Sequence, residues 1–306
     1  MHVQILLSTF NGEKYIAEQL DSILTQSYKS ISVLIRDDGS QDGTLKIIEQ
    51  YILRHPNQVK LLKGDNIGVV KSFLALLEQA DNDVVFYSFC DQDDVWLPHK
   101  VEASVKALKY KNDNIPLMHF SSTYLTDSKL SPIKKWPKSP SKPLSFNNAV
   151  IENIAVGTTI TINKAAKEML TAKQPNSDNL IMHDWWFYLC ISAFGETMYE
   201  LKPTVLYRQH EENLIGGNKS LRDLILRKLR SYSNNKGKRI LFKQAQEFWE
   251  CYGDEISDIQ KGQLQLFLKP RYNIWDRIYF LKQSHYYRQS LYENILYKML
   301  ILIGYI

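Results

Sequence analysis

Three aspartates within four positions, Asp91, Asp93 and Asp94, follow the mostly apolar residues 84–89. Side chains alternate along an extended chain, so Asp91 and Asp93 share one side and can approach the same hard divalent cation. The alternative is a solvated turn whose last acidic residue begins a helix, where the helix dipole favours negative charge. The other polar motifs of the chain decide between these two interpretations.

Two later segments contain further side chains that can do chemistry. Residues 183–186 read His-Asp-Trp-Trp, and Asp184 is either the N-cap of a helix or a carboxylate that accepts a proton. Residues 205–210 end with Arg208, Gln209 and His210, and a lone histidine is more often an ordinary residue than a ligand. As isolated segments both favour the structural interpretation, so their significance depends on the acidic cluster.

The elements that must position these side chains alternate between strands and helices. Apolar runs at residues 2–8, 31–35, 59–62 and 84–89 predict strands, and a polar loop with an amphipathic helix follows each of the first three. This order predicts parallel βαβ units with helices on both faces of one sheet. Ligands bind such sheets outside the carboxyl ends of the strands. The polar residues expected to converge there are Ser8, Thr9, Asp37, Asp38, Asn66 and Asp91.

The middle of the chain is less regular. Residues 98–111 predict a helix, and residues 117–120 and 155–162 predict two further strands. Residues 131–145 contain four prolines with several serines and lysines, and they predict an exposed loop. The glycine signatures of dinucleotide folds and of P-loops do not occur, so any phosphate bound at the strand ends needs a cation to neutralise it.

Composition limits the class of protein. The chain has 306 residues, 44% of them hydrophobic, which is enough for a packed core. Cys90, Cys190 and Cys251 are far apart in apolar surroundings, which predicts reduced thiols and a cytoplasmic protein. The first residues read as a strand and not as a signal peptide, and no apolar run of about 18 residues predicts a membrane-spanning helix.

The net charge of +5 is unevenly distributed. Residues 219–306 contain 16 Lys+Arg and 8 Asp+Glu, a net +8, so residues 1–218 carry −3. The basic, aromatic and helical pattern of residues 219–306 fits either a solvated helix face or contact with an anionic membrane. The last twelve residues, ten of them apolar, either pack on the domain or lie at an interface. No nucleic-acid-binding motif occurs, so we expect no nucleic-acid partner.

Five motifs in this order resemble those of the family 2 glycosyltransferases. They are Ser8-Thr9-Phe10-Asn11-Gly12, Arg36-Asp37-Asp38-Gly39-Ser40-Gln41-Asp42-Gly43-Thr44, Asp91-Gln92-Asp93-Asp94-Val95-Trp96, His183-Asp184-Trp185 and Tyr207-Arg208-Gln209-His210. The similarity covers about residues 1–215 and is strongest to bacterial rhamnosyltransferases of cell-wall, capsule or O-antigen synthesis, most of all in the third motif. It implies an α/β fold of the GT-A type, with a Rossmann-like, mostly parallel sheet flanked by helices. This catalytic domain would span residues 1–218, and a helical C-terminal region would span residues 219–306.

The resemblance also implies a donor site and a metal site. The residues implied or expected to hold the base, ribose and phosphates of a nucleotide-diphospho-sugar are Ser8, Thr9, Asp38, Asn66, Lys71 and Asp91. Asp93 would bind Mg²⁺ or Mn²⁺ on the diphosphate, and His210 would complete the metal site. Asp91 would face either the ribose or the metal.

Asp184 matches the catalytic base of the family. Trp96, Trp185, Trp186 and Arg208 are candidates for contacts with the sugar or the acceptor, although each tryptophan fits the core equally well. The resemblance therefore implies a metal-dependent transferase that inverts the anomeric carbon. Because the Gln-x-x-Arg-Trp motif and the membrane spans of the processive branch do not occur in this sequence, we expect non-processive transfer.

The expected reaction moves L-rhamnose from dTDP-rhamnose to a hydroxyl of a lipid-linked saccharide acceptor, with the protein peripheral at the inner face of the plasma membrane. Nothing in the residues selects thymine over uracil. A glucosyl-, galactosyl- or N-acetylhexosaminyltransferase that uses a UDP-sugar is therefore the alternative. A non-catalytic sugar-nucleotide-binding protein is a third interpretation, and the joint presence of Asp38, Asp93, Asp184 and His210 argues against it.

Overall fold

Strand β1 (Val3–Thr9) lies in the middle of the parallel half of the sheet, and six of its seven side chains are buried. In the computed structural model, which describes residues 1–209 and 239–305, it pairs in parallel with β2 (Ile31–Asp37) and β4 (Phe86–Cys90). Strand β3 (Val59–Lys63) extends this half beyond β2. Near-continuous apolar strands of this kind require cover on both faces.

The other half of the sheet is mixed. Across the described residues the strand order is β3-β2-β1-β4-β8-β6-β9-β5, and β7 pairs with β6. The bounds of these strands are β5 (Val95–Trp96), β6 (Leu117–Thr126), β7 (Pro132–Trp136), β8 (Thr161–Asn163) and β9 (Glu196–Arg208). Strand β9 runs parallel to β6 and antiparallel to β5, which brings the end of β9 beside the loop after β4. The predicted α/β fold is confirmed.

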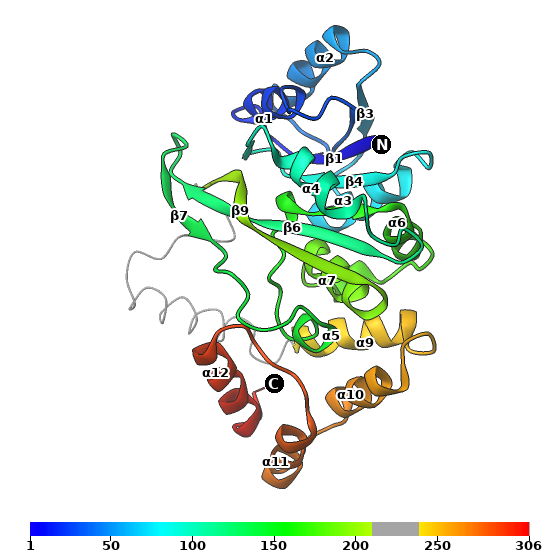
Figure 1. Cartoon of the computed structure of the whole chain (residues 1–306), viewed down its shortest axis with the longest axis vertical. Helices are drawn as coiled ribbons and strands as arrows, with labels where there is room; N and C mark the ends of the chain where they lie inside the picture. Colours follow the sequence, from blue (N-terminus) through cyan, green and yellow to red (C-terminus); the bar gives the residue numbers. More distant parts are fainter. Residues whose placement is uncertain (210–238, 306) are drawn as a thin grey trace.

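Helices cover both faces of the sheet (Figure 1). Side chains of β1 alternate, so Ile5 and Leu7 face one apolar layer and Leu6 faces the other. The first layer is covered by α1 (Ile16–Leu24), α2 (Thr44–Arg54) and α4 (Lys100–Leu108). The second is covered by α3 (Val69–Gln79), α5 (Phe146–Ala149), α6 (Lys164–Thr171) and α7 (His183–Phe194). Two short 3-10 turns, η1 (Gly157–Thr159) and η2 (Ser177–Asn179), precede β8 and α7.

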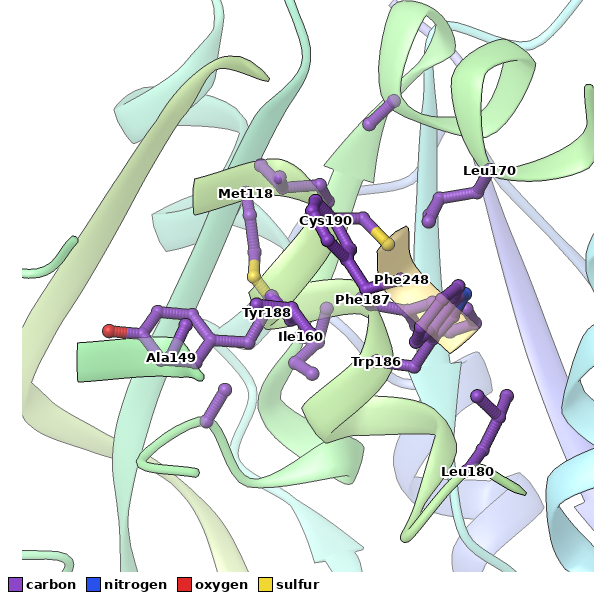
Figure 2. Packing of buried hydrophobic residues seen from close by; sticks show 14 of the residues in the cluster. Met118, Ala149, Ile160, Leu170, Leu180, Trp186, Phe187, Tyr188, Cys190 and Phe248 are labelled. Atoms are coloured by element: carbon purple, nitrogen blue, oxygen red, sulfur yellow. The ribbon is translucent and has the colours of Figure 1, made fainter. Parts of the chain in front are cut away.

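The C-terminal helices extend the second layer. They are α9 (Ile240–Tyr252), α10 (Asp258–Leu268), α11 (Ile274–Gln283) and α12 (Leu291–Leu302). Figure 2 shows Phe248 of α9 in the same apolar cluster as Trp186 and Phe187 of α7, so these helices share the core of the sheet domain. Within the described residues, no helix is long and apolar enough to cross a bilayer.

Two predictions for the middle of the chain were wrong. Residues 131–145 do not form a loop throughout, because β7 pairs with β6 there and sends exposed side chains outward. Residues 155–162 form η1 and the start of β8 in place of one strand. His210 and the expected boundary at 218/219 lie outside the described residues.

Candidate active site

The carboxyl ends of β1, β2 and β4 meet at one edge of the sheet. Thr9 is opposite Asp37 in the register of β1 with β2, and Leu7 is opposite Cys90 in the register of β1 with β4. Asp38 and Asp91 are the next residues along β2 and β4, so they leave the sheet on either side of β1. The structure thus brings together the strand-end residues, where parallel α/β sheets bind their ligands.

The Asp38 side chain is buried and held in place by three groups. Its carboxylate forms an ion pair with the guanidinium of Arg36 and accepts hydrogen bonds from the main-chain N–H groups of Ile67 (3.0 Å) and Gly68 (2.9 Å). Arg36 Nη1 also donates to Ser72 Oγ at 3.2 Å. Asp38 thus engages the two main-chain N–H groups that immediately precede α3.

Gln92 joins the end of β1 to the acidic loop. Thr9 Oγ1 and the main-chain N–H of Phe10 donate to Gln92 Oε1 at 2.6 and 2.9 Å, and Gln92 Nε2 donates to the Phe10 carbonyl at 3.0 Å. A Cβ on Gly12 would lie 2.3 Å from Gln92 Oε1, so a side chain at position 12 would displace this link. The predicted donor residue Ser8 is half-buried and shares a hydrogen bond of 2.7 Å with Ser72.

Three carboxylates, those of Asp91, Asp93 and Asp184, interact electrostatically at this edge. Burial, and then the negative charges of Asp93 and Asp184, raise the pKa of Asp91 to about 8. The loop after β4 and the first turn of α7 therefore form one acidic site, although about 90 residues separate them in the sequence. A cation placed among these carboxylates would relieve their repulsion.

Asp184 lies in the first turn of α7, where Met182 and not Asp184 is the N-cap residue. Burial raises the pKa of Asp184 to about 6. Hydrogen bonds from the main-chain N–H of Trp185, the side chain of Asn153 and the main-chain N–H of Gly157 lower this pKa, but they do not cancel the effect of burial. A carboxylate with this pKa is ionised at pH 7 and remains basic enough to accept a proton.

His183, next to Asp184, is a packing residue. Its ring stacks on Phe73 with centroids 3.9 Å apart, and burial lowers its pKa to about 3, so the ring is neutral at pH 7. A Cβ on Gly157 would lie 3.2 Å from His183 Nε2 and 3.6 Å from Asp184 Oδ2. A side chain at position 157 would therefore crowd the first turn of α7.

Tyr207, near the end of β9, also faces the acidic site. Burial raises its pKa above the usual range, and the charges of Asp94, Asp91, Asp93 and Asp184 raise it further. The phenol is therefore neutral and can donate a hydrogen bond to a carboxylate or a ligand oxygen. Sequence analysis placed Tyr207 in a motif but gave it no role, because only the pairing of β9 with β6 brings it here.

Arg208 does not lie where an acceptor could contact it, which corrects the expectation from sequence. It is 3% exposed, and its guanidinium donates to the carbonyls of Asp93 (2.9 Å) and Ser128 (2.6 Å) and forms an ion pair with Glu18. Its main-chain N–H donates to Asp94 Oδ1 at 3.2 Å. Arg208 thus fixes the acidic loop from behind.

Two of the three candidate tryptophans are also core residues. Trp96 is 2% exposed, donates from Nε1 to Thr158 Oγ1 at 3.3 Å and lies under the ammonium of Lys100. Trp186 is fully buried and packs edge-on against Phe248, so neither ring offers a face to a sugar. Trp185 is partly exposed and donates from Nε1 to the Ala149 carbonyl, which leaves it as the one of the three beside the site.

The other two expected donor residues lie on the rim. Asn66 is exposed in the loop before α3. It lies beside Gly39, where an added Cβ would be 3.1 Å from the main-chain nitrogen of Asn66. Lys71 is exposed in the first turn of α3, and its ammonium lies 3.2 Å from a carboxylate oxygen of Asp178.

A metal site is incomplete within the described part of the chain. No group of three or more His, Cys, Asp or Glu side chains there converges to hold an ion. Asp91 and Asp93 supply hard oxygen donors of the kind that Mg²⁺ and Mn²⁺ prefer, and the negative charges of Asp93 and Asp184 contribute, after burial, to the raised pKa of Asp91. The donor set fits a divalent cation, and the predicted third ligand, His210, lies outside the described residues.

Comparison with known proteins decides the family. The model of the family described as glycosyl transferase family 2 matches residues 4–170, more than half of the chain. The chain belongs to this family. A relative, the dTDP-rhamnosyl transferase RfbG of Shigella flexneri, is 31% identical over 224 residues, which cover 71% of this chain and 75% of RfbG. The protein is therefore a glycosyltransferase, and the family predicted from the five motifs is confirmed.

Solved structures of other glycosyltransferases have the same fold. TarS of S. aureus in complex with UDP-GlcNAc aligns with a TM-score of 0.59 at 18% identity, covering 88% of this chain and 71% of TarS. The mannosyltransferase PcManGT of Pyrobaculum calidifontis, in complex with GDP-Man and Mn²⁺, aligns with a TM-score of 0.53 at 13% identity, covering 99% and 87%. At these identities the similarity establishes the fold of this chain and not its donor.

Proposed function

We propose that this protein is an inverting, metal-dependent, non-processive transferase that moves L-rhamnose from dTDP-rhamnose to a hydroxyl of a lipid-linked glycan in bacterial surface polysaccharide synthesis. The observation that carries the proposal is the acidic site, in which Asp184, with a pKa of about 6, acts electrostatically on Asp91 beside Asp93. A base and a cation-binding pair at one sheet edge are the two elements that direct displacement at a sugar phosphate needs.

In this proposal Asp184 accepts the proton of the acceptor hydroxyl while its oxygen forms a bond to the anomeric carbon. The bond from that carbon to the diphosphate oxygen breaks on the opposite face, and its electron pair leaves with the nucleotide. Asp93 and Asp91, with His210, would hold Mg²⁺ or Mn²⁺, and the ion would supply positive charge to the leaving diphosphate. Tyr207, whose pKa the charges of these carboxylates raise, would donate a hydrogen bond within the same site.

The donor base and ribose would lie over Ser8, Thr9 and Asp38. Support comes from the rigid attachment of Asp38 to Arg36 and to the loop before α3. Asn66 and Lys71 would lie near the phosphates. Lys71 is free to reach them because its pair with Asp178 is exposed on both sides and exposed ion pairs contribute only about 0–1 kcal/mol.

The choice of dTDP-rhamnose rests on the named activity of RfbG. A screen of dTDP-rhamnose beside UDP-glucose, UDP-galactose and UDP-N-acetylglucosamine, with Mn²⁺ and a synthetic lipid-linked acceptor, tests it. Transfer from dTDP-rhamnose alone is the expected result. Transfer from a UDP-sugar in its place would replace the donor but keep the enzyme class.

The same screen separates an enzyme from a sugar-nucleotide-binding protein. The expected product carries the inverted anomeric configuration, which nuclear magnetic resonance of the isolated glycan reports. Binding of a donor without turnover on any acceptor, in a protein whose Asp184→Asn variant still complements a deletion strain, would favour the non-catalytic interpretation. We place the enzyme in the cytoplasm, peripheral at the inner face of the plasma membrane, where lipid-linked acceptors are available.

A further inference from the structure

Helices α11 and α12 expose large apolar side chains in regular rows. Trp275 and Tyr279 lie one turn apart on α11, and Leu291, Ile295 and Met299 lie at intervals of four residues on α12. Residues four apart share one side of a helix, so each helix has an apolar outer stripe. Trp275 is 75% exposed and Leu291 is 65% exposed. We call these two stripes together the C-terminal apolar face.

Exposed large hydrophobic residues are concentrated in this part of the described chain. Of the 18 exposed large hydrophobic residues in the described chain, nine lie between residues 272 and 303. Single exposed apolar residues are normal on a protein surface, but a clustered set of this size is typical of an interaction surface. In Figure 1 the two helices form the end of the molecule opposite α2 and β3, away from the parallel half of the sheet.

The exposure does not result from loose helices. Phe280 of α11 and Tyr297 and Ile301 of α12 are buried in the core cluster, so one side of each helix is anchored. Arg277 Nη1 donates to the Leu302 carbonyl at 3.0 Å, which joins the start of α11 to the end of α12. The C-terminal apolar face thus lies on two anchored helices. Of the two alternatives for the last twelve residues, packing on the domain is confirmed for Tyr297 and Ile301.

The charge around this face is positive. Residues 269–306 contain six Lys or Arg and two Asp or Glu, a net +4. Both acidic residues are engaged, since Asp276 accepts hydrogen bonds at the start of α11 and Glu293 pairs with Arg288 at 3.4 Å. Exposed Lys282 and Lys298 lie on the same two helices. Exposed lysines on the helices of an aromatic and aliphatic surface are complementary to anionic lipid headgroups over acyl chains.

We propose that the C-terminal apolar face docks on an anionic lipid bilayer, with α11 and α12 lying in the plane of the interface. Tryptophan and tyrosine rings prefer the boundary between headgroups and acyl chains, and neighbouring lysines contact anionic headgroups. The inference deepens the proposed function, because a lipid-linked acceptor would be presented at the same surface, but vesicle binding tests it without any sugar or donor.

The test uses the full chain and vesicles of phosphatidylcholine with about 30 mol% phosphatidylglycerol, or of phosphatidylcholine alone. The test variant is Trp275→Ser/Ile295→Ser/Met299→Ser. The matched control is Leu53→Ser/Tyr110→Ser, which removes two residues 82% and 84% exposed elsewhere on the surface. Thermal unfolding and circular dichroism verify that each variant is folded.

Wild type and control are expected to sediment with the anionic vesicles, and the test variant to bind them at least about tenfold more weakly. Lys282→Glu/Lys298→Glu is expected to weaken binding at low salt and much less at high salt. Wild-type binding by the folded test variant, or no binding by wild type, would overturn the proposal. So would a wild-type dimer that the test variant converts to a monomer in light scattering, because the face would then be a self-association surface.

Donor turnover with a water-soluble acceptor separates this proposal from the proposed function. The test variant is expected to keep wild-type turnover on that acceptor while losing vesicle binding. A protein that binds vesicles through this face but transfers no sugar would leave the docking surface standing and refute the enzymatic proposal.

Discussion

The guanidinium Nε of Arg208 donates a hydrogen bond of 2.9 Å to the main-chain carbonyl oxygen of Asp93. The last residue of β9 thereby fixes the loop that carries the proposed metal ligands, and it does so from the buried side.

Replacing Arg208 should therefore disturb the acidic loop more than the rest of the fold. We expect Arg208→Met to lower the free energy of unfolding by about 2 kcal/mol and turnover by at least about tenfold, because the Asp93 and Ser128 carbonyls lose buried donors. The matched control is Glu18→Gln, which changes only the half-exposed partner. Equal turnover in the two variants, measured at saturating donor and metal, would contradict a positioning role.

Asp184→Asn removes the proposed base while keeping the size of the side chain. We expect kcat to fall by about 10²–10⁴ with little change in donor affinity or thermal stability. Asp178→Asn, in the exposed turn before α7, is the control and should retain near wild-type kcat. Initial rates of nucleotide release with acceptor present provide the measurement, and wild-type kcat in Asp184→Asn would refute the assignment.

The pH dependence of turnover follows from the same carboxylate. Because burial raises the pKa of Asp184 to about 6 and only the ionised form accepts a proton, kcat should rise from pH 5 to pH 7 and be half-maximal near pH 6. Rates at constant ionic strength and saturating Mn²⁺ test this. A flat profile between pH 5 and 7 would show that Asp184 does not limit the reaction.

Cation binding should release protons. At pH 7 Asp91 is mostly protonated because its pKa is raised to about 8, and a divalent cation stabilises the ionised form, so the proton leaves. Titration calorimetry with Mn²⁺ in buffers of different ionisation enthalpy should report release of about one proton. Asp91→Asn should abolish this release, and EDTA should abolish turnover in wild type. Full turnover after exhaustive EDTA treatment would exclude the metal-dependent mechanism.

Lys100 gives a prediction about stability. Its ammonium is fully buried, 2.8 Å from Ser88 Oγ and 3.5 Å from the centroid of the Trp96 ring, and burial lowers its pKa from 10.5 to about 7. At pH values between the folded and unfolded pKa, the amine of Lys100 is protonated in the unfolded chain and largely neutral in the folded protein. The free energy of unfolding should therefore rise from pH 7 to pH 9, with a contribution from Lys100 of at most about 1.4 kcal/mol per pH unit.

Lys100→Met should remove this slope, and urea unfolding at pH 7 and pH 9 provides the measurement. Lys106→Met, at an exposed position of the same helix, is the control and should keep the wild-type slope. An unchanged slope in Lys100→Met would mean that the buried amine stays charged across this range.

Several parts of the site could be predicted because they depend on local pattern. Apolar runs locate β1, β2 and β4, and the rule for parallel sheets places Thr9, Asp38 and Asp91 at one edge. The motif at residues 183–186 likewise places Asp184 in the first turn of a helix, which the structure has at α7. Each of these inferences needs only a strand or helix period and the polar residue that follows it.

The remaining assignments depend on pairing between distant segments. The sequence alone indicates that Arg208 is an exposed cation. In the structure, β9 pairs with β6, more than 80 residues away, and this pairing buries Arg208 behind the acidic loop. The sequence is equally consistent with Trp186 as a sugar-stacking residue or as a core residue. The packing of α9 on α7 decides for the core. The closeness of Gly157 to His183 depends on the packing of η1 against α7, which no local period contains.

The edge-on contact between Trp186 and Phe248, with ring centroids 6.1 Å apart, has a consequence for protein engineering. Helix α7, which carries Asp184, is supported on its buried side by α9, the first of the C-terminal helices. A chimera that exchanges these helices between relatives would have to exchange the facing side of α7 as well.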